Sequence, residues 1–125
     1  MEAQRIAIIG LGRVGGAFLE QLLEKQARGI DLLAVAELQD TAGRRRAEAA
    51  GLRLCSLDEI VALRETVDTI FELTGLKSVR RELREKLKLS HNLHTVVAPE
   101  STVRIIWALM SDAELPPASG PAVGY

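Results

Sequence analysis

Short apolar runs alternate along the chain with longer stretches in which apolar residues recur every three or four positions. Runs of four to seven mostly apolar residues are typical of buried β-strands, and the three-to-four spacing is typical of amphipathic helices. The predicted strands cover residues 5–9, 31–37, 52–55, 67–73 and 94–98. The predicted helices cover about residues 13–26, 41–50, 57–65, 78–89 and 99–110.

This strict alternation predicts an α/β fold with a doubly wound parallel sheet. Right-handed crossovers place the helices on both faces, and the expected order of the five strands is 3-2-1-4-5. In such a sheet, a ligand crevice lies at the carboxyl ends of the first and fourth strands, where the strand order reverses. The pattern therefore predicts the location of a binding site.

Local signals mark the ends of several elements. Gly29 and Gly51 are placed to end the first and second helices, and Ser56 with Glu59 forms a capping box that starts the third. Residues 114–125 are rich in Pro and Gly and have no periodicity. We expect one domain over residues 1–113, followed by a flexible tail or linker.

A glycine-rich turn follows the first predicted strand and carries the clearest chemical signal. The sequence G-L-G-R-V-G begins at Gly10 and matches G-x-G-x-x-G between a strand and a helix. Gly10 permits the tight turn, Gly12 lets a pyrophosphate approach the backbone, and Gly15 lets the helix lie close to the sheet. The amides of Arg13 and Val14 then face the anion. This context predicts a dinucleotide site.

An acidic residue at the end of the second strand indicates which dinucleotide binds. Glu37 stands 22 residues after Gly15, where a carboxylate can bind the adenosine ribose and repels a 2′-phosphate. NAD is therefore favoured over NADP. Three consecutive arginines at residues 44–46 lie near the same ribose. NADP becomes the alternative if one of them folds back onto the site.

Further candidate ligands follow the fourth and fifth strands. Thr74 and Gly75 end the fourth strand, where the nicotinamide ribose and the pyrophosphate would lie. Glu100 follows the fifth strand on the same rim, as a ligand or as an acid in the first turn of a helix. Cys55 lies near the expected adenine pocket, and packing is its simpler role. We expect no catalytic residue among these positions.

Composition narrows the classes of partner. The net charge is −1, and the basic helix at residues 78–89 lacks interleaved aromatics, so we expect no nucleic-acid surface. One cysteine and two histidines make a poor metal site. We expect no signal peptide and no membrane span, so the cytoplasm is the expected location.

The stretch I-A-I-I-G-L-G-R-V-G-G, followed by V-A-E and an Arg/Ala-rich helix, occurs within residues 6–50. It resembles the cofactor domain of the glucose–fructose oxidoreductase/inositol dehydrogenase superfamily, and those of homoserine and aspartate dehydrogenases and dihydrodipicolinate reductase look similar. The resemblance implies that Gly10, Gly12 and Gly15 hold the pyrophosphate and that Glu37 binds the ribose. The lysine of the E-K-P motif in the sugar dehydrogenases has no counterpart at residues 97–100, which read V-A-P-E. A weaker similarity links the chain to N-terminal domains of bacterial signalling proteins.

Three functions follow from these features. The first is a regulatory module that binds NAD(H) and reports its occupancy or redox state. The second is the cofactor-binding half of an NAD-dependent oxidoreductase, because hydride transfer also needs a bound substrate and an acid or base. The third is a module that binds AMP or CoA in the same crevice. We expect a homo-oligomer or a further domain or subunit as the protein partner.

Overall fold

The computed structural model describes residues 2–110 and 115–116. Four short strands form one parallel sheet in the order β2-β1-β3-β4. The strands are β1 (Gln4–Ile9), β2 (Ile30–Ala36), β3 (Thr69–Glu72) and β4 (Val96–Pro99). The α-helices are α1 (Arg13–Glu24), α2 (Ala42–Ala49), α3 (Leu57–Val61), α4 (Lys77–Leu89) and α5 (Glu100–Met110). Two 3₁₀ turns, η1 (Gln26–Arg28) and η2 (Arg64–Thr66), precede β2 and β3.

The parallel α/β class is confirmed, but the expectation of five strands is wrong. Residues 52–55 make only an isolated bridge, in which Leu54 pairs with Val35 on the outer side of β2. Two backbone hydrogen bonds flank this bridge, from Val35 N to Arg53 O and from Cys55 N to Val35 O. Ser56 caps α3 at the very next residue. The segment is therefore too short to continue as a strand, although it lies where the third strand was expected.

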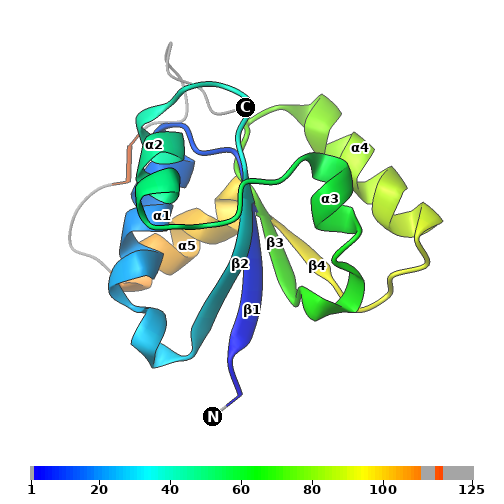
Figure 1. The fold of residues 1–125 in the computed structure, drawn as a ribbon, viewed down its shortest axis with the longest axis horizontal. Coiled ribbons are helices and arrows are strands. Elements are labelled where there is room, and N and C mark those ends of the chain that lie inside the picture. Colours follow the sequence, from blue (N-terminus) through cyan, green and yellow to red (C-terminus); the bar gives the residue numbers. More distant parts are fainter. Residues whose placement is uncertain (1, 111–114, 117–125) are drawn as a thin grey trace.

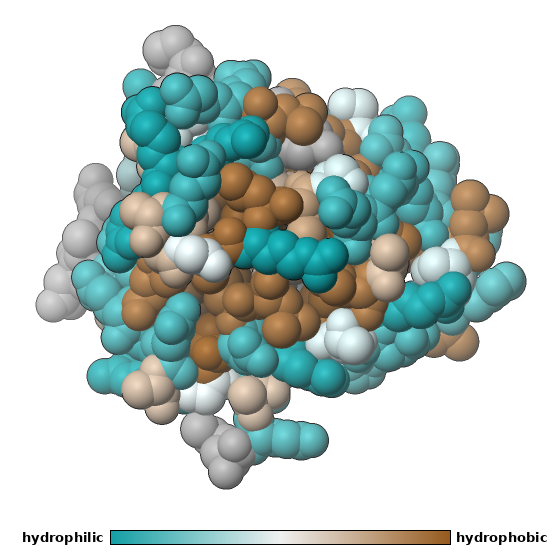
Figure 2. Space-filling view, in the orientation of Figure 1, coloured by the Kyte–Doolittle hydropathy of each residue, from teal (hydrophilic) through white to brown (hydrophobic). Residues whose placement is uncertain are grey.

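Helices cover both faces of the sheet (Figure 1). On one face, α1 and α5 pack on an apolar cluster that includes Ile8, Phe18, Phe71 and Val103. The other face is covered by α3 and α4, whose buried residues pack with Ala7, Ile9 and Ile70 in a second cluster. Figure 2 shows apolar side chains between the two helix layers, in the part of the view where Figure 1 has β1 and β2.

The predicted end signals are present in the structure, although α1 ends at Glu24 and α3 at Val61, before the expected residues 26 and 65. Gly29 adopts a left-handed φ of 88° after η1, and the capping box of Ser56 and Glu59 is present in both directions. Thr41 caps α2 by accepting a hydrogen bond from Arg44 N. Pro99 ends β4 rather than opening the last helix, which begins at Glu100.

Two expectations concern regions beyond the sheet. The proposed tail at residues 114–125 lies outside the described residues except for Leu115 and Pro116; Leu115 packs against the first apolar cluster. Among the helices of residues 2–110, none has the length and apolar character needed to cross a membrane.

The close contact between Gly15 of α1 and the carbonyl group of Gly10 yields the first prediction. A Cβ atom on Gly15 would lie 1.8 Å from the carbonyl oxygen of Gly10, whereas a Cβ on Gly16 would meet its nearest neighbour, Gly43 Cα, at 3.5 Å. Gly15→Ala should therefore lower the free energy of unfolding by about 1–3 kcal/mol through overpacking. Gly16→Ala is the matched control and should cost much less. Urea denaturation of both variants measures the difference, and equal stabilities would contradict this packing.

Candidate functional site

The glycine turn connects β1 to α1 and packs closely against the end of β3. Gly10 has a φ of 95°, which disfavours any side chain, and a Cβ there would lie 2.8 Å from Leu73 C and Thr74 N. Gly15 allows α1 to approach the carbonyl of Gly10. The first and third glycines of the motif are therefore required by packing within the protein itself.

The first turn of α1 presents backbone amides without a side-chain cap. Gly12 is the N-cap residue and makes no side-chain capping hydrogen bond, and Gly16 N donates back to Gly12 O at 2.7 Å. The amides of Arg13 and Val14 precede this bond and have no acceptor within the helix. Together with the positive end of the helix dipole, they form a site suited to an anion.

Glu37 lies directly after β2 and is only 3% exposed. Its Oε1 accepts a hydrogen bond from Leu11 N at 2.7 Å, and its Oε2 accepts one from Gln39 N at 3.1 Å. The carboxylate therefore connects the glycine turn with the segment that follows β2. The sequence predicts a ribose-binding carboxylate at this position; in the structure both of its oxygens accept hydrogen bonds from backbone amides.

Thr41 also connects the glycine turn with the segment that follows β2. Its hydroxyl donates to Leu11 O at 2.7 Å and accepts from Arg44 N at 3.0 Å. The start of α2 also approaches closely, because a Cβ on Gly43 would lie 2.5 Å from Leu11 O. The small residues Gly16 and Gly43 thus let α2 sit against α1 and the turn.

A cavity of about 390 Å³ opens between the glycine turn and the start of α2. It is lined by Leu11, Gly12, Arg13, Gln39, Asp40, Thr41, Ala42 and Gly43. Residues 39–43 were not among the expected site residues. Their only signal in the sequence was a helix-capping threonine and a glycine shortly after the second strand.

The three arginines at the start of α2 are engaged in contacts with the protein. Arg44 donates to Glu37 O at 2.5 Å and to Glu48 Oε1 at 3.1 Å. Arg45 pairs with Asp40 at 3.1 Å, and Arg46 pairs with Glu20 at 2.5 Å. These contacts hold the guanidinium groups along the surface of α2.

The turn after β3 is organised by a buried acid that the sequence reading missed. Glu72 is 0% exposed; its Oε1 accepts hydrogen bonds from both the backbone N–H and the hydroxyl of Thr74. Its Oε2 accepts from Arg80 Nε at 3.0 Å. Thr74 is itself 0% exposed, and Gly75 follows with a φ of 74°. An acidic residue inside an apolar strand was the available signal.

The remaining sequence candidates lie apart from the cavity. Glu100 begins α5, directly after β4, and its Oε1 lies 3.5 Å from Arg104 Nη2. Cys55 is buried in the apolar cluster beneath α3, and burial raises the pKa of its thiol. Within the described part of the chain, no group of three or more His, Cys, Asp or Glu residues is placed to hold a metal ion.

Comparison with known protein families identifies the family of this chain. Residues 10–103 match the family model described as the NAD-binding domain of homoserine dehydrogenase. The chain belongs to this family. It is an NAD(P)-binding domain, and the matched residues include the glycine turn, Glu37, Thr74, Gly75 and Glu100.

Solved structures agree with this NAD(P)-binding domain in fold. A homoserine dehydrogenase from S. aureus superposes with a TM-score of 0.57 at 19% identity, over 87% of this chain and 30% of that one. The enzyme from Thiobacillus denitrificans gives a TM-score of 0.56 at 24% identity, over 86% of this chain and 26% of that one. The chain thus spans less than a third of the length of these enzymes. No curated protein matches it.

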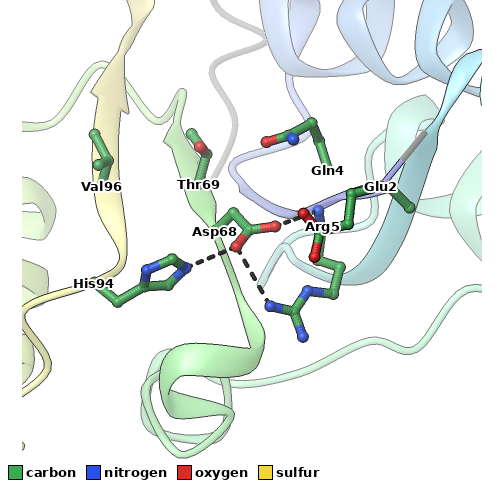
Figure 3. Close-up of a pocket in the computed structure, with 8 residues that line it drawn as sticks. Glu2, Gln4, Arg5, Asp68, Thr69, His94 and Val96 are labelled. Atoms are coloured by element: carbon green, nitrogen blue, oxygen red, sulfur yellow. Dashed lines mark hydrogen bonds and ion pairs between the residues drawn. The ribbon is translucent and has the colours of Figure 1, made fainter.

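A second cavity of about 710 Å³ lies at the opposite end of the sheet of this domain, where the strands begin. Figure 3 shows Asp68 between Arg5 and His94 on its wall. Asp68 Oδ2 accepts from Arg5 N at 2.8 Å, and Oδ1 lies 2.7 Å from His94 Nε2 and 3.4 Å from Arg5 Nη2. These hydrogen bonds, that from Arg5 N foremost, lower the pKa of Asp68 to about 2. The cluster joins the starts of β1, β3 and β4.

This lowered pKa predicts a pH-dependent stability. Because the folded-state pKa is about 2 and the ordinary value is 3.8, the ionised carboxylate stabilises the fold above about pH 4. That contribution is lost as the pH falls from about 4 to about 2. Wild type should therefore be more stable than Asp68→Asn near neutral pH, and the difference should shrink across this window. Urea unfolding at several pH values tests it, and a constant difference would contradict it.

The contact of Thr41 with the glycine turn yields a further prediction. Thr41→Val removes the cap of α2 and the donor to Leu11 O, so the free energy of unfolding should fall by about 1–2 kcal/mol. Thr41→Ser keeps the hydroxyl and should retain most of the stability. Thermal unfolding of the two variants measures this, and a valine variant as stable as the serine variant would refute the role of the hydroxyl.

Proposed function

We propose that this domain binds NAD(H) across the carboxyl ends of β2, β1 and β3, as the cofactor-binding part of an NAD-dependent oxidoreductase. The observation that carries the proposal is the uncapped first turn of α1 at the end of β1, within a chain of the homoserine dehydrogenase NAD-binding family. An anionic pyrophosphate is the ligand that such a turn binds best.

The roles of the glycine turn follow from this placement. The amides of Arg13 and Val14 hold the pyrophosphate, Gly12 lets it approach the backbone, and Gly10 and Gly15 shape the turn. The exposed side chain of Arg13 lines the cavity and adds positive charge beside the phosphates.

The remaining site residues then divide between the two halves of the dinucleotide. The adenosine half lies on the β2 side, where the nearly buried Glu37 fixes the wall beside the ribose by holding Leu11 N and Gln39 N. The nicotinamide half lies on the β3 side, against Thr74 and Gly75, with Glu100 on the same rim. Because Thr74 is 0% exposed, its contribution is to shape this wall rather than to contact the cofactor directly.

Two features favour NAD over NADP. The carboxylates of Glu37 and Asp40 lie on the β2 side, where a 2′-phosphate would stand, and like charges repel. Arg44 and Arg45 are already engaged by Glu48 and Asp40. A 2′-phosphate would therefore have to break these ion pairs to bind either of these two arginines.

Family membership favours the oxidoreductase over the regulatory module. The matched solved structures are homoserine dehydrogenases, about three times as long as this chain. We therefore expect the substrate-binding and catalytic groups to lie on a further domain or subunit, and oxidation of homoserine is the reaction to test first. We also propose self-association and a cytoplasmic location.

The central test is a calorimetric titration with NADH, NADPH, ADP-ribose and CoA. NADH and ADP-ribose should bind and compete for one site, and NADPH should bind more weakly. Preferential binding of CoA would support the alternative ligand instead. Turnover of homoserine by this chain alone would contradict the expectation that catalytic groups lie elsewhere.

A substitution in the glycine turn tests whether the dinucleotide binds there. Gly12→Val should abolish NADH binding, because the added side chain occupies the space of the pyrophosphate. Gly12 has a φ of −80°, so a side chain there needs no left-handed backbone, and the variant should fold. Ala50→Val adds bulk at an exposed position and is the control. Unchanged affinity in a folded Gly12→Val protein would refute this placement.

A further inference from the structure

Glu72 is a fully buried acid at the carboxyl end of β3, and the roles assigned above do not use it. It ends β3 at the end of the sheet opposite to the N-terminus (Figure 1) and points to the face covered by α3 and α4. Burying a carboxylate is costly unless hydrogen bonds and an opposite charge compensate it. Here Thr74 donates to it twice and Arg80 supplies the charge.

These contacts continue into the turn that leads to α4. The hydroxyl of Thr74 donates its one proton to Glu72 and accepts a hydrogen bond from Leu76 N at 3.0 Å. Gly75 between them takes the left-handed conformation. The carboxylate thus holds the end of β3, the turn and, through Arg80, the first turns of α4 in one arrangement.

The same turn touches the glycine loop. A Cβ on Gly10 would lie 2.8 Å from Thr74 N, so the backbones of the two turns are in close contact. Since the strand order is β2-β1-β3, the adenosine half on the β2 side leaves the other half of the dinucleotide to the β3 side. A displacement of Thr74 would therefore act mainly on the nicotinamide side, and would reach the diphosphate only through the contact of this turn with Gly10.

We propose that Glu72 is a positioning residue of the dinucleotide site, whose buried carboxylate fixes residues 74–76 as the wall for the nicotinamide half. This inference rests on the proposed binding of NAD(H). Glu72 has no contact with the cofactor; it acts through the hydroxyl and the amide of Thr74. Arg80 neutralises the carboxylate and fixes its second oxygen.

The test compares two ligands on matched variants. NADH contains both halves of the dinucleotide, whereas ADP contains only the adenosine and the two phosphates. Glu72→Gln places an amide against Arg80, and Thr74→Val removes the hydroxyl. Both should weaken NADH binding by about fivefold to tenfold, the effect of losing one ordinary hydrogen bond, and leave ADP binding within about twofold. Thr74→Ser keeps the hydroxyl and should bind both ligands like wild type.

Asp68→Asn is the control, because it makes the same acid-to-amide change immediately before the other end of β3. It should change neither affinity. If Glu72 only stabilises the fold, its substitution should change the affinities for NADH and ADP equally or leave both unchanged. Each of these two results, in folded variants, would overturn the inference. If Glu72→Gln does not fold, the comparison of Thr74→Val with Thr74→Ser decides. Wild-type protein that binds neither ligand would instead overturn the proposed function.

Discussion

The backbone of Leu11, in the glycine turn, is held through both its N–H and its carbonyl by residues that follow β2. Its N–H donates to the buried carboxylate of Glu37, and its carbonyl accepts from the hydroxyl of Thr41, each at 2.7 Å. A turn rich in glycine has much conformational freedom to lose, so these two bonds fix what the sequence leaves flexible. The orientation of the first amides of α1, and with it the proposed pyrophosphate site, depends on these two hydrogen bonds.

The two sides of the proposed dinucleotide site share the same local arrangement of a buried acid and a following turn. Glu37 follows β2 and accepts a hydrogen bond from the amide two residues later, and Glu72 ends β3 and does the same with Thr74. Both carboxylates are nearly or fully buried. Each therefore orders the start of a connection on one side of the glycine turn. The cofactor would then meet two connections set in place before it binds.

The two ends of the sheet differ in what their charged groups do. At the amino ends of the strands, Asp68 joins Arg5 and His94 and ties three strands together. At the carboxyl ends, the acids hold turns next to the proposed site instead of tying strands to each other. In a parallel sheet, the connection that follows each strand begins at the carboxyl end of that strand. Loops at this end of the sheet can vary without disturbing the sheet itself.

Local patterns in the sequence determined the α/β class, most helix ends, the capping box and the place of the glycine turn. These features depend on short-range periodicity and on the conformational preferences of single residues. The tertiary structure decided that residues 52–55 make one bridge instead of a strand, because α3 begins at once. It also decided the roles of Glu72, Thr41 and Gly43, since their partners lie in other segments or in a turn whose path no periodicity fixes. Glu72 orders the turn after β3 because it is buried there beside Thr74 and Arg80. Its burial results from the packing of the whole chain and cannot be seen in the local sequence.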